Sequence, residues 1–154
     1  MAAINANAEV MRFFPSTQTK EETKGFIQRA QKSYEERGYT YFAVDHLADQ
    51  KMIGFIGLAY QKYESPFTPA TDIGWRLDPA YWGRGLATEG AKASLEYGLK
   101  ELKLPQIIAV AVEQNLPSIR VMEKIGLKKI GNFKHPMLKE YPALEACVAY
   151  GISQ

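Results

Sequence analysis

The residues best suited to chemistry stand where a predicted strand meets a predicted helix, at Gly83, Arg84 and Gly85. Glycines let the main chain approach a ligand closely, and the first N–H groups of a helix lack partners inside that helix. With the positive charge of Arg84, they predict a site for a phosphate or pyrophosphate. A plain strand-to-helix turn would use the same residues. The spacing fits neither a Walker loop nor Gly-x-Gly-x-x-Gly, since residue 88 is Thr.

Two elements must hold this loop. Residues 71–77 alternate in character and predict a strand, with Ile73, Trp75 and Leu77 on one side. Residues 86–102 predict the helix that follows, because apolar residues recur along one face. These residues are Ala87, Ala91, Leu95, Leu99 and Leu102.

A long helix is predicted earlier in the chain, at residues 20–37. Thr19 and Glu22 fit a capping box at its start, and Gly38 is suited to end it. Apolar residues gather on one of its faces. They are Phe26, Ile27, Ala30 and Tyr34.

The remaining pattern completes an α+β domain with a mixed sheet. A helix is predicted over 115–125, with Asn115 as its N-cap and Gly126 as its stop. The Pro-rich stretch 65–69 predicts a surface loop. Runs of apolar, β-branched and aromatic residues predict the other strands, at 39–44, 52–60, 106–112, 127–133 and 143–152.

Composition narrows the class of protein. The 154 residues carry a net charge of +2 and suit one domain, residues 1–154, with no strongly basic face for nucleic acid. Cys147 is the single cysteine, so we expect no disulfide and no metal site. No secretory signal is visible, and the longest apolar run, 107–112, is too short to span a membrane. We therefore expect a cytoplasmic protein.

Two blocks resemble a known family. The run from Ile73 to Glu89, with Tyr-Trp-Gly-Arg-Gly-Leu-Ala-Thr-Glu at its end, resembles the acetyl-CoA pyrophosphate loop of the GNAT superfamily of N-acetyltransferases. The general signature of that loop is Gln/Arg-x-x-Gly-x-Gly/Ala, and Trp82 takes the place of its Gln or Arg. This form is similar to the branch of the ribosomal-protein alanine and serine N-acetyltransferases. The block from Asn115 to Leu127 is similar to the family's Asn-x-x-Ser…Glu-Lys-x-Gly-Phe helix.

The resemblance implies a GNAT fold, a mostly antiparallel sheet flanked by helices, with acetyl-CoA as co-substrate and an amine as acceptor. The main chain of Trp75, Arg76 and Leu77 is then expected to bind the pantetheine arm and the acetyl group, and the Asn115 side chain to contact that arm. The amides expected to hold the pyrophosphate are those of Gly83, Arg84, Gly85, Leu86, Ala87 and Thr88.

The chain departs from the family at two places. Many relatives carry a Tyr as general acid seven residues after the Asn, where this chain has Met122. Ser118 could substitute as proton donor, or could only cap its helix. We expect the family's first strand to be missing. We therefore expect the strand at 39–44 to lie at the sheet edge, covered by a homodimer partner or by residues near the N-terminus.

Other candidates concern the acceptor. Glu113 follows a central strand and could be the base, or a solvated charge at a helix entry. His135 lies in the loop before the last strand, which borders the acceptor site in this fold. His46 is interpreted as a turn residue. The aromatic residues Tyr60, Tyr63 and Phe67 could line an acceptor cleft or pack in the core.

The sequence thus predicts direct acetyl transfer to a primary amine, with a strand amide near Trp75 to Leu77 stabilising the oxyanion. An α-amine is favoured over lysine because more of it is neutral at pH 7. Roughly a tenth of an amine of pKa near 8 is neutral, against about one in a few thousand for a lysine of pKa near 10.4. A CoA-binding module without catalysis and a regulatory domain that binds ATP or NAD remain as alternatives.

Overall fold

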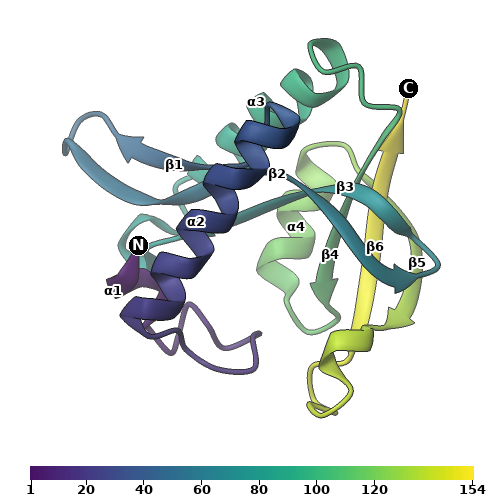
Figure 1. Ribbon diagram of the computed structural model, residues 1–154, viewed down its shortest axis with the longest axis horizontal. Coiled ribbons are helices and arrows are strands. Elements are labelled where there is room, and N and C mark those ends of the chain that lie inside the picture. Colours follow the sequence, from purple (N-terminus) through teal and green to yellow (C-terminus); the bar gives the residue numbers. More distant parts are fainter.

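The computed structural model describes residues 1–154, and its centre is one six-stranded sheet (Figure 1). The strand order is β1-β2-β3-β4-β6-β5, with every neighbouring pair antiparallel except β3 and β4. The α+β class with a mixed, mostly antiparallel sheet is therefore confirmed. The strands are β1 Tyr41–His46, β2 Lys51–Ser65, β3 Thr68–Leu77, β4 Gln106–Val112, β5 Lys128–Lys134 and β6 Ala146–Ser153.

Helices cover both faces of the sheet. Phe26 of α2 packs against Phe55 of β2, with ring centroids 5.0 Å apart, while the adjacent Ile56 points to the other face and meets α3 at Gly90. Successive strand residues face opposite ways, so α2 and α3 lie on opposite sides (Figure 1). The helices are α1 Ala2–Asn5, α2 Lys20–Arg37, α3 Leu86–Lys100 and α4 Leu116–Lys124, with short 3₁₀ helices η1 Pro79–Tyr81 and η2 Pro136–Leu138.

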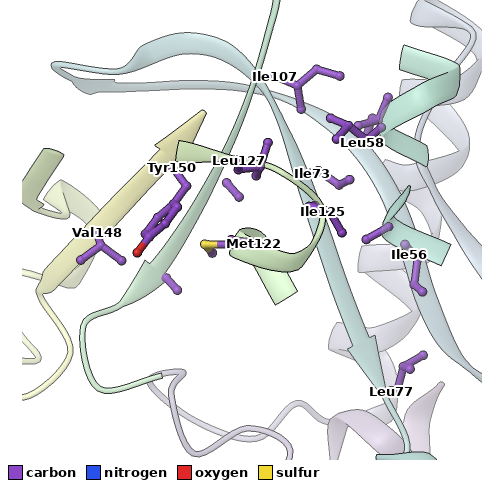
Figure 2. Close-up of a cluster of buried hydrophobic side chains, with 14 of the residues drawn as sticks. Ile56, Leu58, Ile73, Leu77, Ile107, Met122, Ile125, Leu127, Val148 and Tyr150 are labelled. Atoms are coloured by element: carbon purple, nitrogen blue, oxygen red, sulfur yellow. The ribbon is translucent and has the colours of Figure 1, made fainter. Parts of the chain in front are cut away.

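The main core lies between the sheet and the pair α3 and α4. Ala91 of α3 and Ile107 of β4 are completely buried there. Figure 2 shows Met122 of α4 among Ile125, Leu127 and Tyr150. Both faces of β4 are covered, since the successive residues Ile107 and Ile108 are completely buried, and this explains the unbroken apolar run of that strand.

The predicted helix boundaries hold where capping chemistry sets them. Thr19 and Glu22 form the capping box of α2, and Gly38 ends this helix in the left-handed conformation at φ 77°. The predicted apolar face of α2 is only partly buried, however. Ile27 is 41% exposed and Tyr34 is 52% exposed, because only the Phe26 side of the helix meets the sheet.

The Pro-rich stretch 65–69 lies at the surface, as predicted, but it is a shorter turn than the loop that the sequence suggests. β2 continues to Ser65 and β3 begins at Thr68, so these residues form the tight turn of a long hairpin. A hydrogen bond between the Ser65 and Thr68 hydroxyls, 2.7 Å long, closes the turn. The Phe67 ring then packs edge-on against Phe133 of β5.

β1 forms one edge of the sheet, as predicted, and pairs only with β2. Residues near the N-terminus make no backbone hydrogen bonds to it. They attach instead to α2 and β3 through Asn5, whose side chain contacts Thr23 and Arg76. Cover by the N-terminus is therefore wrong, and a partner subunit stays a prediction. No helix combines the length and the apolar character needed to cross a membrane.

Candidate active site

A cleft opens where β3 and β4 separate. The two strands pair only at Thr71 with Ile107 and at Asp72 with Ile108, and then run apart toward Leu77 (Figure 2). The cleft between them has a volume of about 840 Å³. The edge of β3 from Ile73 to Leu77 therefore faces the cleft without a strand partner. Its backbone groups are available to an amide-containing ligand.

The loop at the start of α3 opens onto this cleft. Gly83 and Gly85 have φ values of 70° and 76°, which other residues adopt only with strain. The amides of residues 83–88 have no hydrogen-bond acceptor within the chain, and the first one that does is Glu89, bonded to the Gly85 carbonyl at 2.9 Å. The Trp82 indole donates to the Leu77 carbonyl at 2.9 Å and fixes the loop to the end of β3. This is the form expected of a pyrophosphate site.

The Arg84 side chain turns away from the cleft, so its predicted contribution of positive charge to the phosphate site is not what the structure shows. Its guanidinium Nη2 lies 3.3 Å from His46 Nε2, and its Cζ lies 5.2 Å from the centre of the Tyr81 ring. His46 Nδ1 in turn lies 2.9 Å from an Asp49 oxygen. Only the backbone amide of Arg84 remains with the loop.

Asn115 and Ser118 lie on the opposite wall, at the start of α4. The Asn115 side chain is the helix cap, because its oxygen accepts the Ser118 N–H at 3.3 Å. The idea that Ser118 itself caps the helix is therefore wrong. The Ser118 hydroxyl has no hydrogen-bond partner in the chain and faces the cleft.

Of the two other predicted catalytic residues, only His135 reaches the cleft. Glu113 is not among the lining residues, and its carboxylate accepts a hydrogen bond from the Asn132 amide. His135 packs against Tyr63 with the rings tilted by 38° and 4.4 Å between centroids, and its Nδ1 accepts the Met137 N–H at 3.2 Å. Burial lowers the pKa of His135, so the ring is neutral with its proton on Nε2. It can donate a hydrogen bond but has no free lone pair for a base.

Asp72 is the functional candidate that sequence reasoning missed. It lies where β3 and β4 part, and burial raises the pKa of its carboxyl to about 6. The Tyr41 hydroxyl donates to one oxygen at 2.7 Å and the Gln61 amide donates to the other at 3.0 Å. The available signal was an acidic residue inside a strand, next to the motif at Ile73 and on the opposite face from it.

Arg76 lies on the same face of β3 as Asp72, toward α2. Its Nη1 donates to the Asn5 side-chain oxygen at 2.9 Å, and its Cζ lies 4.4 Å from the centre of the Phe14 ring and 5.2 Å from that of Phe55. Burial lowers the pKa of Arg76 to about 10. The sequence pointed only to the backbone of this residue.

Aromatic rings form much of the wall near Asp72. Tyr41 and Phe26 each lie about 5.0 Å from Phe55, measured between ring centroids. Of the aromatic residues flagged near the Pro-rich stretch, Tyr63 lines the cleft, whereas Tyr60 lies under Arg37. No group of three or more His, Cys, Asp or Glu side chains is arranged as a metal site.

This geometry can be compared with known proteins. The family model described as an acetyltransferase (GNAT) domain matches residues 1–128. The chain belongs to the GNAT acetyltransferase family. The "Uncharacterized N-acetyltransferase YnaD" of Bacillus subtilis is 37% identical over 130 residues, which are 84% of this chain and 72% of the relative.

Solved GNAT structures agree with the fold. An acetyltransferase (GNAT family) from Bacillus anthracis superposes with a TM-score of 0.77 at 33% identity, over 97% of this chain and 84% of that one. The ribosomal-protein-S5-alanine acetyltransferase of Vibrio fischeri has a TM-score of 0.75 at 21% identity, over 99% of this chain and 86% of that one. GNAT enzymes use acetyl-CoA, and the protein is an acetyltransferase of this family.

Proposed function

We propose that the protein transfers the acetyl group of acetyl-CoA to a primary amine in the cleft between β3 and β4. The observation that carries the proposal is the position of Asp72. Its carboxylate stands at the point where the strands part, beside the unpaired backbone edge of β3. A proton acceptor and backbone donors thus line the same cleft.

The residues around the cleft fit the cofactor from one end to the other. The free amides of residues 83–88 suit the diphosphate, and the edge of β3 from Ile73 to Leu77 suits the amides of the pantetheine arm. The Asn115 oxygen is committed to its helix cap, which leaves the amide nitrogen to face that arm. Bound here, acetyl-CoA supplies an activated acetyl group.

Asp72 is suited to accept the proton of the amine. With a pKa of about 6, roughly nine in ten of these carboxyls are ionised at pH 7. A base with a pKa near the working pH is efficient, because it is both available and strong enough. Tyr41 and Gln61 hold the carboxylate in place through one hydrogen bond each. A weakly basic amine, such as an α-amine, suits such a base best.

Two further side chains can serve as donors. The Ser118 hydroxyl faces the cleft without another partner and can give a proton to the departing thiolate. His135 can donate from Nε2 to the acceptor. Met122, at the position where many relatives carry a Tyr, is 2% exposed and has no proton to give. A thiol leaves with little help, since its ordinary pKa is about 8.5.

A CoA-binding module without catalysis is the competing function, favoured by the apolar Met122 at the usual acid position. The test incubates the full chain with acetyl-CoA and a panel of primary amines, measures the CoA thiol released, and identifies acetylated amines by mass spectrometry. We expect amine-dependent thiol release. A protein whose melting temperature rises with acetyl-CoA, but which acetylates no amine, would be the binding module.

A further inference from the structure

Arg76 is a half-buried cation without a counterion in the chain. No Asp or Glu oxygen lies within 4.0 Å of its guanidinium, although four lysine–carboxylate ion pairs are present in the chain. Its Nε is removed from solvent and has no hydrogen-bond partner. The one side chain to which it donates a hydrogen bond, Asn5, is neutral. An unpaired charge that is partly removed from water is costly, and an anion placed beside it would recover part of that cost.

The surroundings hold the guanidinium in a fixed position. Phe14 and Phe55 flank it, and Asn5 fixes Nη1. Asn5 is itself fully buried, and its amide nitrogen donates to Gln18 at 3.0 Å and to Thr23 at 3.1 Å. The direction of the Asn5 oxygen is therefore determined by three contacts. A cation held in this way loses little freedom when it binds a ligand.

The side of the sheet identifies the ligand as the acceptor rather than the cofactor. Arg76, Gly74 and Asp72 alternate onto the α2 face of β3, whereas Ile73 and Leu77 belong to the core on the opposite face, with α3. The loop suited to diphosphate begins α3. Arg76 and Asp72 thus line the part of the cleft that lies toward α2.

We propose that the acceptor amine carries a carboxylate, which binds the Arg76 guanidinium while the amine lies toward Asp72. This inference rests on the proposed function and names its substrate class. Asp72 and Arg76 are four residues apart on one strand, or about 13 Å between Cα atoms. The acid therefore lies several bonds from the amine, as in a dipeptide or an aminobenzoate, rather than on the adjacent carbon.

The test compares acids with their carboxamides. Glycylglycine and glycylglycinamide form one pair, and 4-aminobenzoate and 4-aminobenzamide form another. A peptide bond separates amine from acid in the first pair, so amidation changes the reactivity of the amine little. We expect kcat/KM for the acid to exceed that for its amide by at least about tenfold, which is the range of a charge-assisted hydrogen bond.

Three variants assign the preference to Arg76. Arg76→Met should reduce it to within about threefold of unity, and Arg76→Lys should keep part of it. Asn5→Asp places a carboxylate beside Arg76 within the chain, so it should also reduce the preference. A merely structural role of Arg76 would change both members of a pair equally, and the ratio removes that effect. If Arg76→Met fails to fold, Arg76→Lys and Asn5→Asp still test whether the preference for the acid depends on Arg76.

Failure of this inference can be distinguished from failure of the proposed function. Equal use of acids and amides by the parent protein, or an unchanged ratio in the variants, overturns the carboxylate assignment while acetyl transfer stands. A loss of acetyl-CoA affinity in Arg76→Met as large as the loss of acid preference would also overturn it, because the anion would then be the cofactor. Acetylation of no amine at all would overturn both.

Discussion

The Tyr41 hydroxyl lies 2.7 Å from an Asp72 oxygen, and the Tyr41 ring covers Gly74 so closely that a Cβ there would meet it at 3.1 Å. An edge-strand residue thus reaches across β2 to hold a carboxylate on β3. The absence of a side chain at Gly74 is what makes room for this reach. Positioning of Asp72 therefore depends on the pairing of three consecutive strands, β1, β2 and β3.

Tyr41→Phe should impair the base without removing it. The hydrogen bond from Tyr41 lowers the Asp72 pKa, so its loss should raise that pKa above about 6. The acid limb of the pH profile of kcat/KM should move to higher pH, and activity at pH 7 should fall several-fold. Tyr39→Phe is the matched control, since the Tyr39 hydroxyl bonds the adjacent Thr71 at 2.8 Å. That variant should lose stability but keep the acid limb where it was.

Asp72→Asn should lower kcat/KM by about 10²- to 10⁴-fold and abolish the acid limb. The stability of the Asn variant, unlike its activity, should improve relative to the parent as pH rises. Because burial raises the folded-state pKa from 3.8 to about 6, the carboxyl stabilises the fold when protonated, and this advantage is lost as pH rises through 6. Relative to the parent, the Asn variant should gain roughly 2 kcal/mol between pH 4 and pH 8. Urea unfolding of both proteins at both pH values measures this difference. If the Asn variant gains no stability relative to the parent at pH 8, the prediction is contradicted.

Gly85→Asp should abolish the rise in melting temperature that acetyl-CoA produces, because its carboxylate would stand against the pyrophosphate. Gly38→Asp is a closely matched control. Both glycines have φ near 76° and open space where a Cβ would lie, but Gly38 ends α2, away from the cleft. The two variants should lose similar stability, and only the one at Gly85 should lose the cofactor effect. An unchanged shift in Gly85→Asp would show that the loop assignment is wrong.

Ser118→Ala and Asn115→Ala should separate chemistry from capping. Asn115→Ala removes the cap and should cost about 1 kcal/mol of stability. Ser118→Ala should leave stability nearly unchanged and lower turnover by more than about tenfold if the hydroxyl donates a proton in the rate-limiting step. Thermal melts and steady-state kinetics on both proteins measure these effects. Normal turnover per folded Ser118→Ala molecule would leave water as the donor.

The free edge of β1 should pair with another chain. This strand has a partner on one side only, and its own residue Phe42 is 46% exposed. We expect a dimer by light scattering, with slow hydrogen exchange for the amides of residues 41–46. A monomer in which these amides exchange freely would exclude this arrangement.

The sequence by itself determined the elements whose signals are local. Thr19, Glu22 and Gly38 fixed the ends of α2, because a capping box and a left-handed glycine need only nearby residues. Gly83 and Gly85 likewise placed the loop at the start of α3, and Asn115 the start of α4. The α+β class followed from the order of such elements.

The tertiary structure decided which side chains meet. Asp72 became a candidate base only because the parting of β3 from β4, the reach of Tyr41 and burial together raise its pKa, and no local pattern encodes those contacts. Glu113 was excluded and Arg84 turned away for the same reason, since partners distant in sequence engage them. The pairing of Asn5 with Arg76 spans 71 positions of the chain. Local spacing predicts where a backbone can bind a phosphate, whereas the charge and direction of a side chain depend on which strands and helices pack around it.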